Sequence, residues 1–386
     1  MTWQQKYRVS IAVVALSCSA CGGDDEPQSR ADAAIVSCAV PAGSGVAFDA
    51  DAELCDKLSS YRFFVGDMVD QVPNDRVVPY DVTTALYADY TYKYRFLWLP
   101  EGTAMAYRAR DAFAFPTGSV LIKTFAYPRD MRNPERGQTL LETRLLYLTS
   151  SGWAVATYVW NQDQTEAIRK VAGDRIPSQW IHTDGTDRQI NYSVPNENQC
   201  KNCHEESDDE IAPLGPKARY LNSDFAYASG TENQLKHLAQ SGYLTGLPAD
   251  PAQVPRAPVW NDPATGSLDE RARTWLDINC AHCHNPRGAA RTSGLDLSFD
   301  QSNLYELGHC KPPVAAGGGS GGRQYNIVPG KPGDSILIYR LESDEPDERM
   351  PEVGRQLEDE DGVALIREWI TAMPTGSCTG GAAARP

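Results

Sequence analysis

Two copies of the sequence Cys-x-x-Cys-His restrict the possible folds of this chain more than any other feature. Cys-x-x-Cys-His is the attachment sequence of a c-type haem: both thiols add to vinyl groups of the porphyrin, and the histidine becomes the proximal ligand of the iron. With 10 Cys and 6 His among 386 residues, two chance matches are not expected. We therefore expect two covalently bound haem c groups, one at Cys200, Cys203 and His204, the other at Cys280, Cys283 and His284.

The N-terminus has the form of an export signal. Lys6 and Arg8 precede an apolar run at 9–16, which has the length of a signal-peptide core and is too short to span a bilayer. The residues at 17–25 resemble the lipobox of bacterial lipoproteins, in which a small residue precedes a lipidated cysteine, here Cys21. A lipobox that ends at Cys18, and ordinary cleavage without a lipid, are the alternatives.

Counting cysteines favours Cys21 as the lipidated residue. Cleavage before Cys21 removes Cys18, and once the haem cysteines are assigned an even number of cysteines is left. An exported protein folds in an oxidising compartment, where two disulfides are plausible. Three connectivities are open, and proximity and domain membership favour the pairs Cys38–Cys55 and Cys310–Cys378.

The expected location and partners follow from the leader and the charge. Gly22, rather than Asp, follows Cys21, and this resembles the sorting rule for lipoproteins of the bacterial outer membrane. The net charge of −15 argues against nucleic acid and favours basic partners or simple solubility. We therefore expect an exported protein on the periplasmic side or surface of the outer membrane, held there by a lipid anchor only. Its expected partners are redox proteins, and its oligomeric state is open.

Short aromatic and β-branched runs between residues 58 and 194 predict strands. The runs at 141–148 and 153–160 flank a Thr-Ser-Ser-Gly turn and predict a hairpin. A second hairpin is predicted around Asp184-Gly185. The best interpretation of this region is a β-sandwich or barrel of roughly eight strands.

The second haem motif follows a predicted helix. Ser267 and Glu270 form a capping box, and the apolar positions after them predict a helix that runs into Cys280. A helix that leads into the attachment motif resembles the class I cytochrome c domains. In this resemblance Met350, which Pro351 follows, matches the distal loop and is the expected second axial ligand of this haem. A thioether opposite an imidazole raises the reduction potential.

The expected fold class is multidomain α+β, with an N-terminal β-sandwich or barrel-like domain followed by a mainly α-helical, cytochrome c-like haem region. The expected parts are a signal peptide with lipobox at 1–21, a tether and entry segment at 22–56, a β-rich domain at 57–195, a first haem-binding segment at 196–250, a linker at 251–266, a class I cytochrome c-like domain with the second haem at 267–378, and a disordered tail at 379–386.

The distal ligand of the first haem does not follow from the sequence. No Met lies between His204 and Met350. The histidines that come into consideration are His182, His237, His282 and His309, of which His282 lies inside the second motif and is constrained by it. An open iron site is a further alternative.

The order of these features resembles a family of bacterial dihaem c-type cytochrome lipoproteins of undefined role. Asn-Gln-Cys-x-x-Cys-His at 198–204, Pro-Leu-Gly-Pro-Lys-Ala-Arg at 213–219 and Asn-Gln-Leu at 233–235 carry the resemblance. It implies electron transfer rather than catalysis. The alternatives are a haem enzyme such as a dihaem peroxidase, whose motifs lie much further apart than the 80 residues seen here, and a ligand-binding β module coupled to an electron relay.

Overall fold

The computed structural model describes residue 38 and residues 42–207, 210–314, 317–375 and 378. The predictions for the signal peptide, for lipidation at Cys21, for the start of the tether and for the tail at 379–386 concern residues outside these ranges. In the described ranges, no helix has the length and apolar character needed to cross a membrane.

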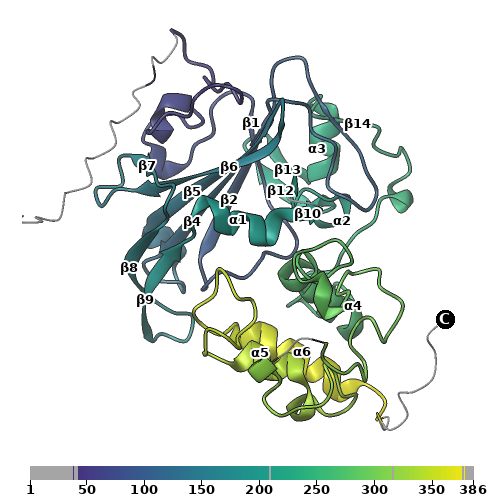
Figure 1. The fold of residues 1–386 in the computed structure, drawn as a ribbon. Helices are drawn as coiled ribbons and strands as arrows, with labels where there is room; N and C mark the ends of the chain where they lie inside the picture. The colour runs from purple at the N-terminus through teal and green to yellow at the C-terminus, as the bar shows by residue number, and fades with distance from the viewer. Residues whose placement is uncertain (1–37, 39–41, 208–209, 315–316, 376–377, 379–386) are drawn as a thin grey trace, which may run out of the picture. The chain divides into compact units, whose positions relative to one another are not determined.

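The described chain is a mixed α+β protein with a large antiparallel sheet and few helices (Figure 1). The sheet has six strands in the order β1-β2-β4-β5-β6-β7, so β1 and β7 form its edges. These strands are β1 (Val77–Tyr80), β2 (Tyr92–Trp98), β4 (Val120–Pro128), β5 (Gln138–Thr149), β6 (Gly152–Trp160) and β7 (Ala167–Arg169).

Both predicted hairpins are present. β5 and β6 pair from Glu142↔Val159 to Thr149↔Gly152, around the predicted turn. The second hairpin consists of β8 (Asp174–Ile181) and β9 (Asp187–Val194) and forms a separate two-stranded sheet. These contacts are local in sequence, and for this reason turn chemistry and alternation were enough to predict them.

One face of the large sheet packs on the entry segment. Phe96, Ile122 and Tyr158 are buried in a core that includes Leu54 and Cys55 of this segment. The hydroxyl groups of Tyr61 and Tyr158 lie 2.9 Å apart, and Tyr158 donates to the backbone carbonyl of Cys55 at 2.9 Å. The buried hydroxyls are thereby satisfied, as burial of a polar group requires.

The opposite face has an apolar zone at each end. At one end Leu97, Leu121 and Leu146 join a core with the segment that follows the first haem motif. At the other end Tyr127 and Val159 pack on the β8–β9 hairpin. Because side chains of a strand alternate between faces, the residues between these zones share the same face. They are charged for the most part: Lys93 and Arg95 on β2, Lys123 on β4, and Glu142 and Arg144 on β5.

The segment at 196–250 alternates short helices with short strands, so the expectation of a mainly helical segment holds only in part. Its helices are α1 (Glu197–His204), α2 (Ala218–Leu221) and α3 (Gln234–Gln240), and its strands are β10 (Glu205–Ser207), β11 (Glu210–Ile211), β12 (Asp224–Tyr227), β13 (Gly230–Asn233) and β14 (Leu244–Thr245), the last paired with β3 (Met105–Ala106). Leu235 and Leu238 are buried in the core beneath the large sheet. This segment is too short to enclose a core of its own, and it uses the sheet instead.

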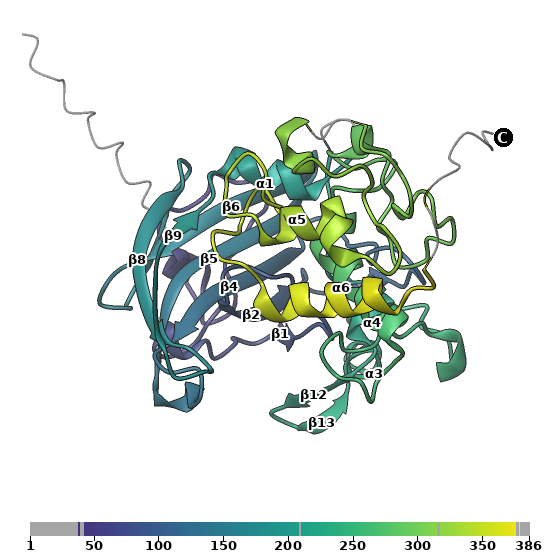
Figure 2. The same ribbon diagram turned by 90° about the horizontal axis from the view of Figure 1, so that it is seen from below.

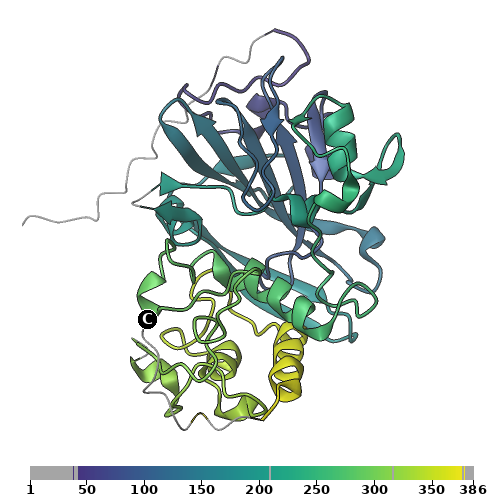
Figure 3. The ribbon, with the colours of Figure 1, turned by 90° about the vertical axis from the view of Figure 1, so that its right-hand side faces the viewer.

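The C-terminal region contains α4 (Leu268–Leu276), a π-helical segment at Asp277–Ala281, α5 (Ile336–Glu342) and α6 (Glu360–Ala372), joined by long irregular stretches. The predicted capping box is confirmed: the Ser267 hydroxyl accepts from the Glu270 amide, and the Glu270 carboxylate accepts from the Ser267 amide at 2.9 Å. Figures 2 and 3 show α6 beside α4. Trp275 of α4 is buried with Trp369 of α6 and donates from Nε1 to Asp359 Oδ2 at 3.0 Å.

The loop between β1 and β2 binds the C-terminal region. The amide of Tyr87 donates to Asn279 Oδ1 at 2.8 Å. The Asp89 carboxylate accepts from the amides of Gln356 and Leu357 at 2.6 and 2.8 Å. These bonds join the β-rich part to the residue before the second haem motif and to the segment that precedes α6.

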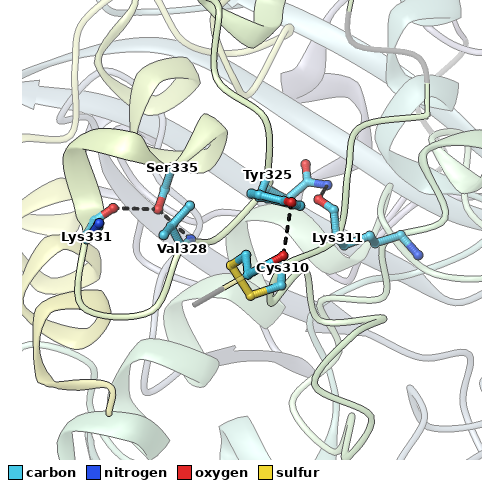
Figure 4. Close-up of a disulfide and its surroundings, with 8 residues drawn as sticks. Cys310, Lys311, Tyr325, Val328, Lys331 and Ser335 are labelled. Carbon is cyan, nitrogen blue, oxygen red and sulfur yellow. Dashed lines mark hydrogen bonds between the residues drawn. A yellow bond between two sulfur atoms is a disulfide. The ribbon is translucent and has the colours of Figure 1, made fainter. Parts of the chain in front are cut away.

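Both expected cysteine pairs are bonded in the structure. Cys38 and Cys55 lie 17 residues apart, and Cys310 and Cys378 lie 68 residues apart. Figure 4 shows the second disulfide beside Tyr325, whose hydroxyl donates to the carbonyl of Cys378 at 3.1 Å. This disulfide attaches the chain after α6 to the loop that precedes α5.

Replacing both Cys310 and Cys378 by serine should lower the free energy of unfolding by about 4 kcal/mol, against about 3 kcal/mol for Cys38 and Cys55, because a longer closed loop restricts the unfolded chain more. Urea denaturation of the two double variants tests this order. Equal losses, or a larger loss for the shorter loop, would contradict it.

Candidate functional site

The first haem motif occupies the C-terminal end of α1. Its N-cap, Asn196, accepts from the Gln199 amide at 2.9 Å, and the Gln199 side chain accepts from the Asn196 amide at 3.0 Å. This capping box starts α1 at Glu197, three residues before Cys200. Helical spacing then puts Cys200 on the same face as Cys203 and His204, three and four residues later.

His204 is oriented as an iron ligand needs to be. Its Nδ1 lies 2.8 Å from the backbone carbonyl oxygen of Ala212, to which it can only donate. In the described part of the chain Nε2 has no hydrogen-bond partner, so its lone pair is free. Burial lowers the pKa of His204 to about 4, which keeps the ring neutral at pH 7. A neutral imidazole with its Nδ1–H bound to a carbonyl is the usual form of a metal-binding histidine.

The second motif begins in the π-helical segment that continues α4. Asn279 holds this segment: it is 2 % exposed, accepts from the Tyr87 amide and donates to the Trp275 carbonyl at 2.9 Å. After it, the amides of Cys283 and His284 both donate to the carbonyl of Cys280, at 3.1 and 2.9 Å. This turn brings the two cysteines and the histidine of the motif together.

His284 repeats the arrangement of His204 with a different acceptor. Its Nδ1 lies 3.0 Å from the hydroxyl oxygen of Ser293. The Ser293 hydroxyl donates its own proton to the carbonyl of Ala290 at 2.8 Å, so it accepts from the histidine. Burial lowers the pKa of His284 to about 4 as well. Both expected proximal ligands are therefore neutral rings whose Nε2 is available for iron.

The two motifs meet in space. The Cys283 sulfur lies 3.0 Å from the backbone carbonyl oxygen of Asn202, 81 residues earlier in the chain. Ligand atoms of Cys203, His282 and Cys283 all lie within 4.8 Å of one another. Cofactors attached at Cys203 and Cys283 would thus be anchored side by side.

Thiol and imidazole are also zinc ligands, and these three residues offer such atoms at one point. A structural zinc site needs four ligands, whereas this cluster has three. Two of the three are also the attachment cysteines of the motifs. The complete Cys-x-x-Cys-His sequences, with both Nε2 atoms free, fit haem better than they fit zinc.

Met350 lies on an irregular segment between α5 and α6. Its amide donates to the carbonyl of Arg340 at 2.8 Å, and its carbonyl accepts from Arg355 at 2.6 Å. Met350 lines a small cavity together with Trp275 of α4 and Asn279, the residue directly before Cys280. The segment therefore returns to the second motif, as the class I resemblance implies.

Of the histidines considered for the first haem, only His282 lies beside the first motif. His182 accepts from Trp180 Nε1 at 3.3 Å within the core of the β8–β9 hairpin. His237 stacks on Tyr227 at a centroid distance of 3.6 Å and binds Glu232. His309 lies near Trp369. The ring of His282 is close to Cys203, and its buried Nδ1 has no hydrogen-bond partner within the described residues.

The sequence reasoning missed a group of cations on the sheet face beside α1. Arg95, Lys123 and Arg144 stand in one row across neighbouring strands. Each interrupts a run of apolar or aromatic residues, and this pattern could have drawn attention to them. Their alignment depends on the strand register, which the sequence does not show.

No protein family, curated protein or solved structure matches this chain. The site is therefore interpreted from its own residues. Two complete attachment motifs, two neutral histidines with free Nε2 atoms and a methionine near the second motif fit two c-type haems. Each residue of both motifs lies in the described part of the chain.

Proposed function

We propose that this protein is an exported dihaem c-type cytochrome that transfers electrons between redox proteins. The observation that carries the proposal is the state of the two histidines: in each, Nδ1 donates to a fixed oxygen, Ala212 O or Ser293 Oγ, and Nε2 is left for iron. A haem iron held by such a ligand cycles between two oxidation states, and this is the chemistry that the cofactor supplies.

The meeting of the two motifs supports passage of electrons from one haem to the other. The thioether bonds form at one edge of each porphyrin, and the sulfur atoms of Cys203 and Cys283 lie within 4.8 Å of each other. The attached edges would therefore be close. A partner that reduces one haem can then be oxidised through the other.

We also propose folds for the C-terminal region and the β-rich part, and axial ligands for the haem irons. The order of α4, attachment motif, α5, Met350 and α6 supports a class I cytochrome c-like region at 267–378. The β-rich part, which the strand pattern predicts to be a sandwich or barrel, would hold the first haem against the charged face of the large sheet. For the first iron, the geometry favours His282 over the other three histidines.

Location and partners complete the proposal. A lipid on Cys21 would hold the protein on the outer membrane, and redox proteins would be the partners. The net charge of −15 supports docking to basic surfaces rather than to nucleic acid.

The test is a haem count on the mature protein, produced in a host that attaches c-type haems. The pyridine haemochrome spectrum should show two covalent haems per chain, and a redox titration followed by absorbance and EPR should resolve two potentials. The double variant Cys200→Ala/Cys203→Ala should keep one haem, and Cys280→Ala/Cys283→Ala the other. Absence of covalent haem from the unmodified protein would reject the proposal.

A further inference from the structure

A row of cations crosses the sheet face that carries the first haem motif. Arg95 of β2 is directly opposite Lys123 of β4, and Lys123 is directly opposite Arg144 of β5. The next residue in the row is Thr157 of β6. Neighbouring strands lie about 4.8 Å apart, so the row from β6 to β2 is on the order of 14 Å long.

The row begins beside the first motif, at β6, and extends from there toward β2. α1 lies against β6 (Figure 1), where the row begins. Arg144 is close enough to Cys200 to lower the pKa of its thiol, although burial has the larger and opposite effect. Lys123 is one strand further along the row, directly opposite Arg144. A flat group attached at Cys200 and Cys203 and centred over His204 would therefore extend along the row.

The two arginines have carboxylate partners. Arg144 binds Glu142 through Nε and Nη2 at 2.8 and 2.6 Å, and the Tyr192 hydroxyl donates to the same carboxylate at 2.7 Å. Arg95 binds Asp81 at 2.5 Å.

The two lysines on this face have no such partner. Lys123 lies over the ring of Phe125 at 4.8 Å, and Lys93 donates to the carbonyl of Thr91 at 2.7 Å. Among the described residues no carboxylate is within 4.0 Å of either ammonium group. Burial lowers the pKa of Lys93 to about 7 and that of Lys123 well below its usual value. Like charges opposite each other destabilise a sheet, and a partly buried cation without a counter-ion is costly.

We propose that Lys123 and Lys93, together with Arg95, bind the propionate groups of the haem attached at Cys200 and Cys203. This inference rests on the proposed function. Haem c has two carboxylates at the edge opposite its thioether bonds, so attachment over β6 directs them toward β4 and β2. The lysines supply the missing positive partners, and the arrangement explains why cations interrupt otherwise apolar strands. A cation beside a propionate also favours the reduced iron, because reduction adds negative charge.

The experiment uses the full-length protein with its haems, in the variants Lys123→Met, Lys93→Met and Lys123→Arg. Both methionine variants should shift the midpoint potential of the first haem to a more negative value and shift its propionate bands in the resonance Raman spectrum. Lys123→Arg keeps the positive charge, so the midpoint potential and the propionate bands should stay close to those of the unmodified protein. The matched control is Lys236→Met, at an exposed position of α3, which should change neither reading.

The outcomes separate this inference from the proposed function. If the unmodified protein contains two haems while the potential and propionate bands of the first are unchanged in both methionine variants, the propionate assignment is wrong and the dihaem cytochrome remains. If Lys123→Met converts the first haem from low-spin to high-spin, Lys123 is an iron ligand, and this too overturns the assignment. If Lys123→Met fails to fold, Lys93→Met and Lys123→Arg still decide.

Discussion

Replacement of Met350 by alanine should lower the reduction potential of the second haem by on the order of 0.1 V or more, a part of the roughly 0.8 V range that axial ligands cover. A thioether sulfur stabilises ferrous iron relative to ferric iron, and its loss removes that preference. The sulfur-to-iron charge-transfer band should disappear in the same variant, while the first haem keeps its potential.

Met373→Ala is the matched control for Met350→Ala. Met373 also lies partly buried in the C-terminal core, directly after α6. Its truncation should cost stability and leave both potentials and the charge-transfer band in place. A band that survives in Met350→Ala would show that another group binds the second iron.

Replacement of Arg355 by methionine should lower the free energy of unfolding by about 3 kcal/mol, because a hydrogen bond from a charged donor contributes about 1.5–3 kcal/mol and these bonds are not additive. Arg355 is 3 % exposed. It donates to the carbonyls of Met350, Ser343, Leu357 and Arg340, at 2.6, 3.1, 3.1 and 3.3 Å. Within the described residues it has no carboxylate partner, so its role is to hold the segment that carries Met350.

The measurement for Arg355→Met is urea denaturation together with the spectrum of the second haem. The sulfur-to-iron charge-transfer band should weaken, because the hydrogen bond from Arg355 to the carbonyl of Met350 no longer fixes the position of Met350. Arg367→Met is the control: this arginine is 41 % exposed and pairs with Glu342 on the surface, so its loss should cost less than about 1 kcal/mol. Equal stability losses in the two variants would refute the positioning role.

Much of the local structure could be predicted, because its causes lie within a few residues. The turn at Thr149–Gly152 joins β5 to β6, and Ser267 caps α4 as expected. Both disulfide pairs could be inferred from cysteine number and proximity. The segment at 196–250 was harder, since its short helices obtain their core from the sheet, and no local pattern reveals that.

The candidate site could likewise be predicted only in part. The cysteines and histidines proposed to hold haem could be named from the sequence alone, because haem attachment requires those residue types at that spacing. The acceptors that fix His204 and His284, Ala212 and Ser293, come eight and nine residues later and could not be chosen in advance. The same is true of His282, which the sequence analysis considered too constrained and the structure brings to Cys203.

What the sequence by itself determined is the chemistry: two motifs that can each hold one haem, the helix that leads into the second, and the cysteines left for disulfides. Only the tertiary structure decided that the two motifs touch and that Arg95, Lys123 and Arg144 form one row beside the first. The physical reason is that motif chemistry and capping act between near neighbours in the chain. Strand register and the contact between Asn202 and Cys283 join residues tens of positions apart, and burial of the whole core selects them.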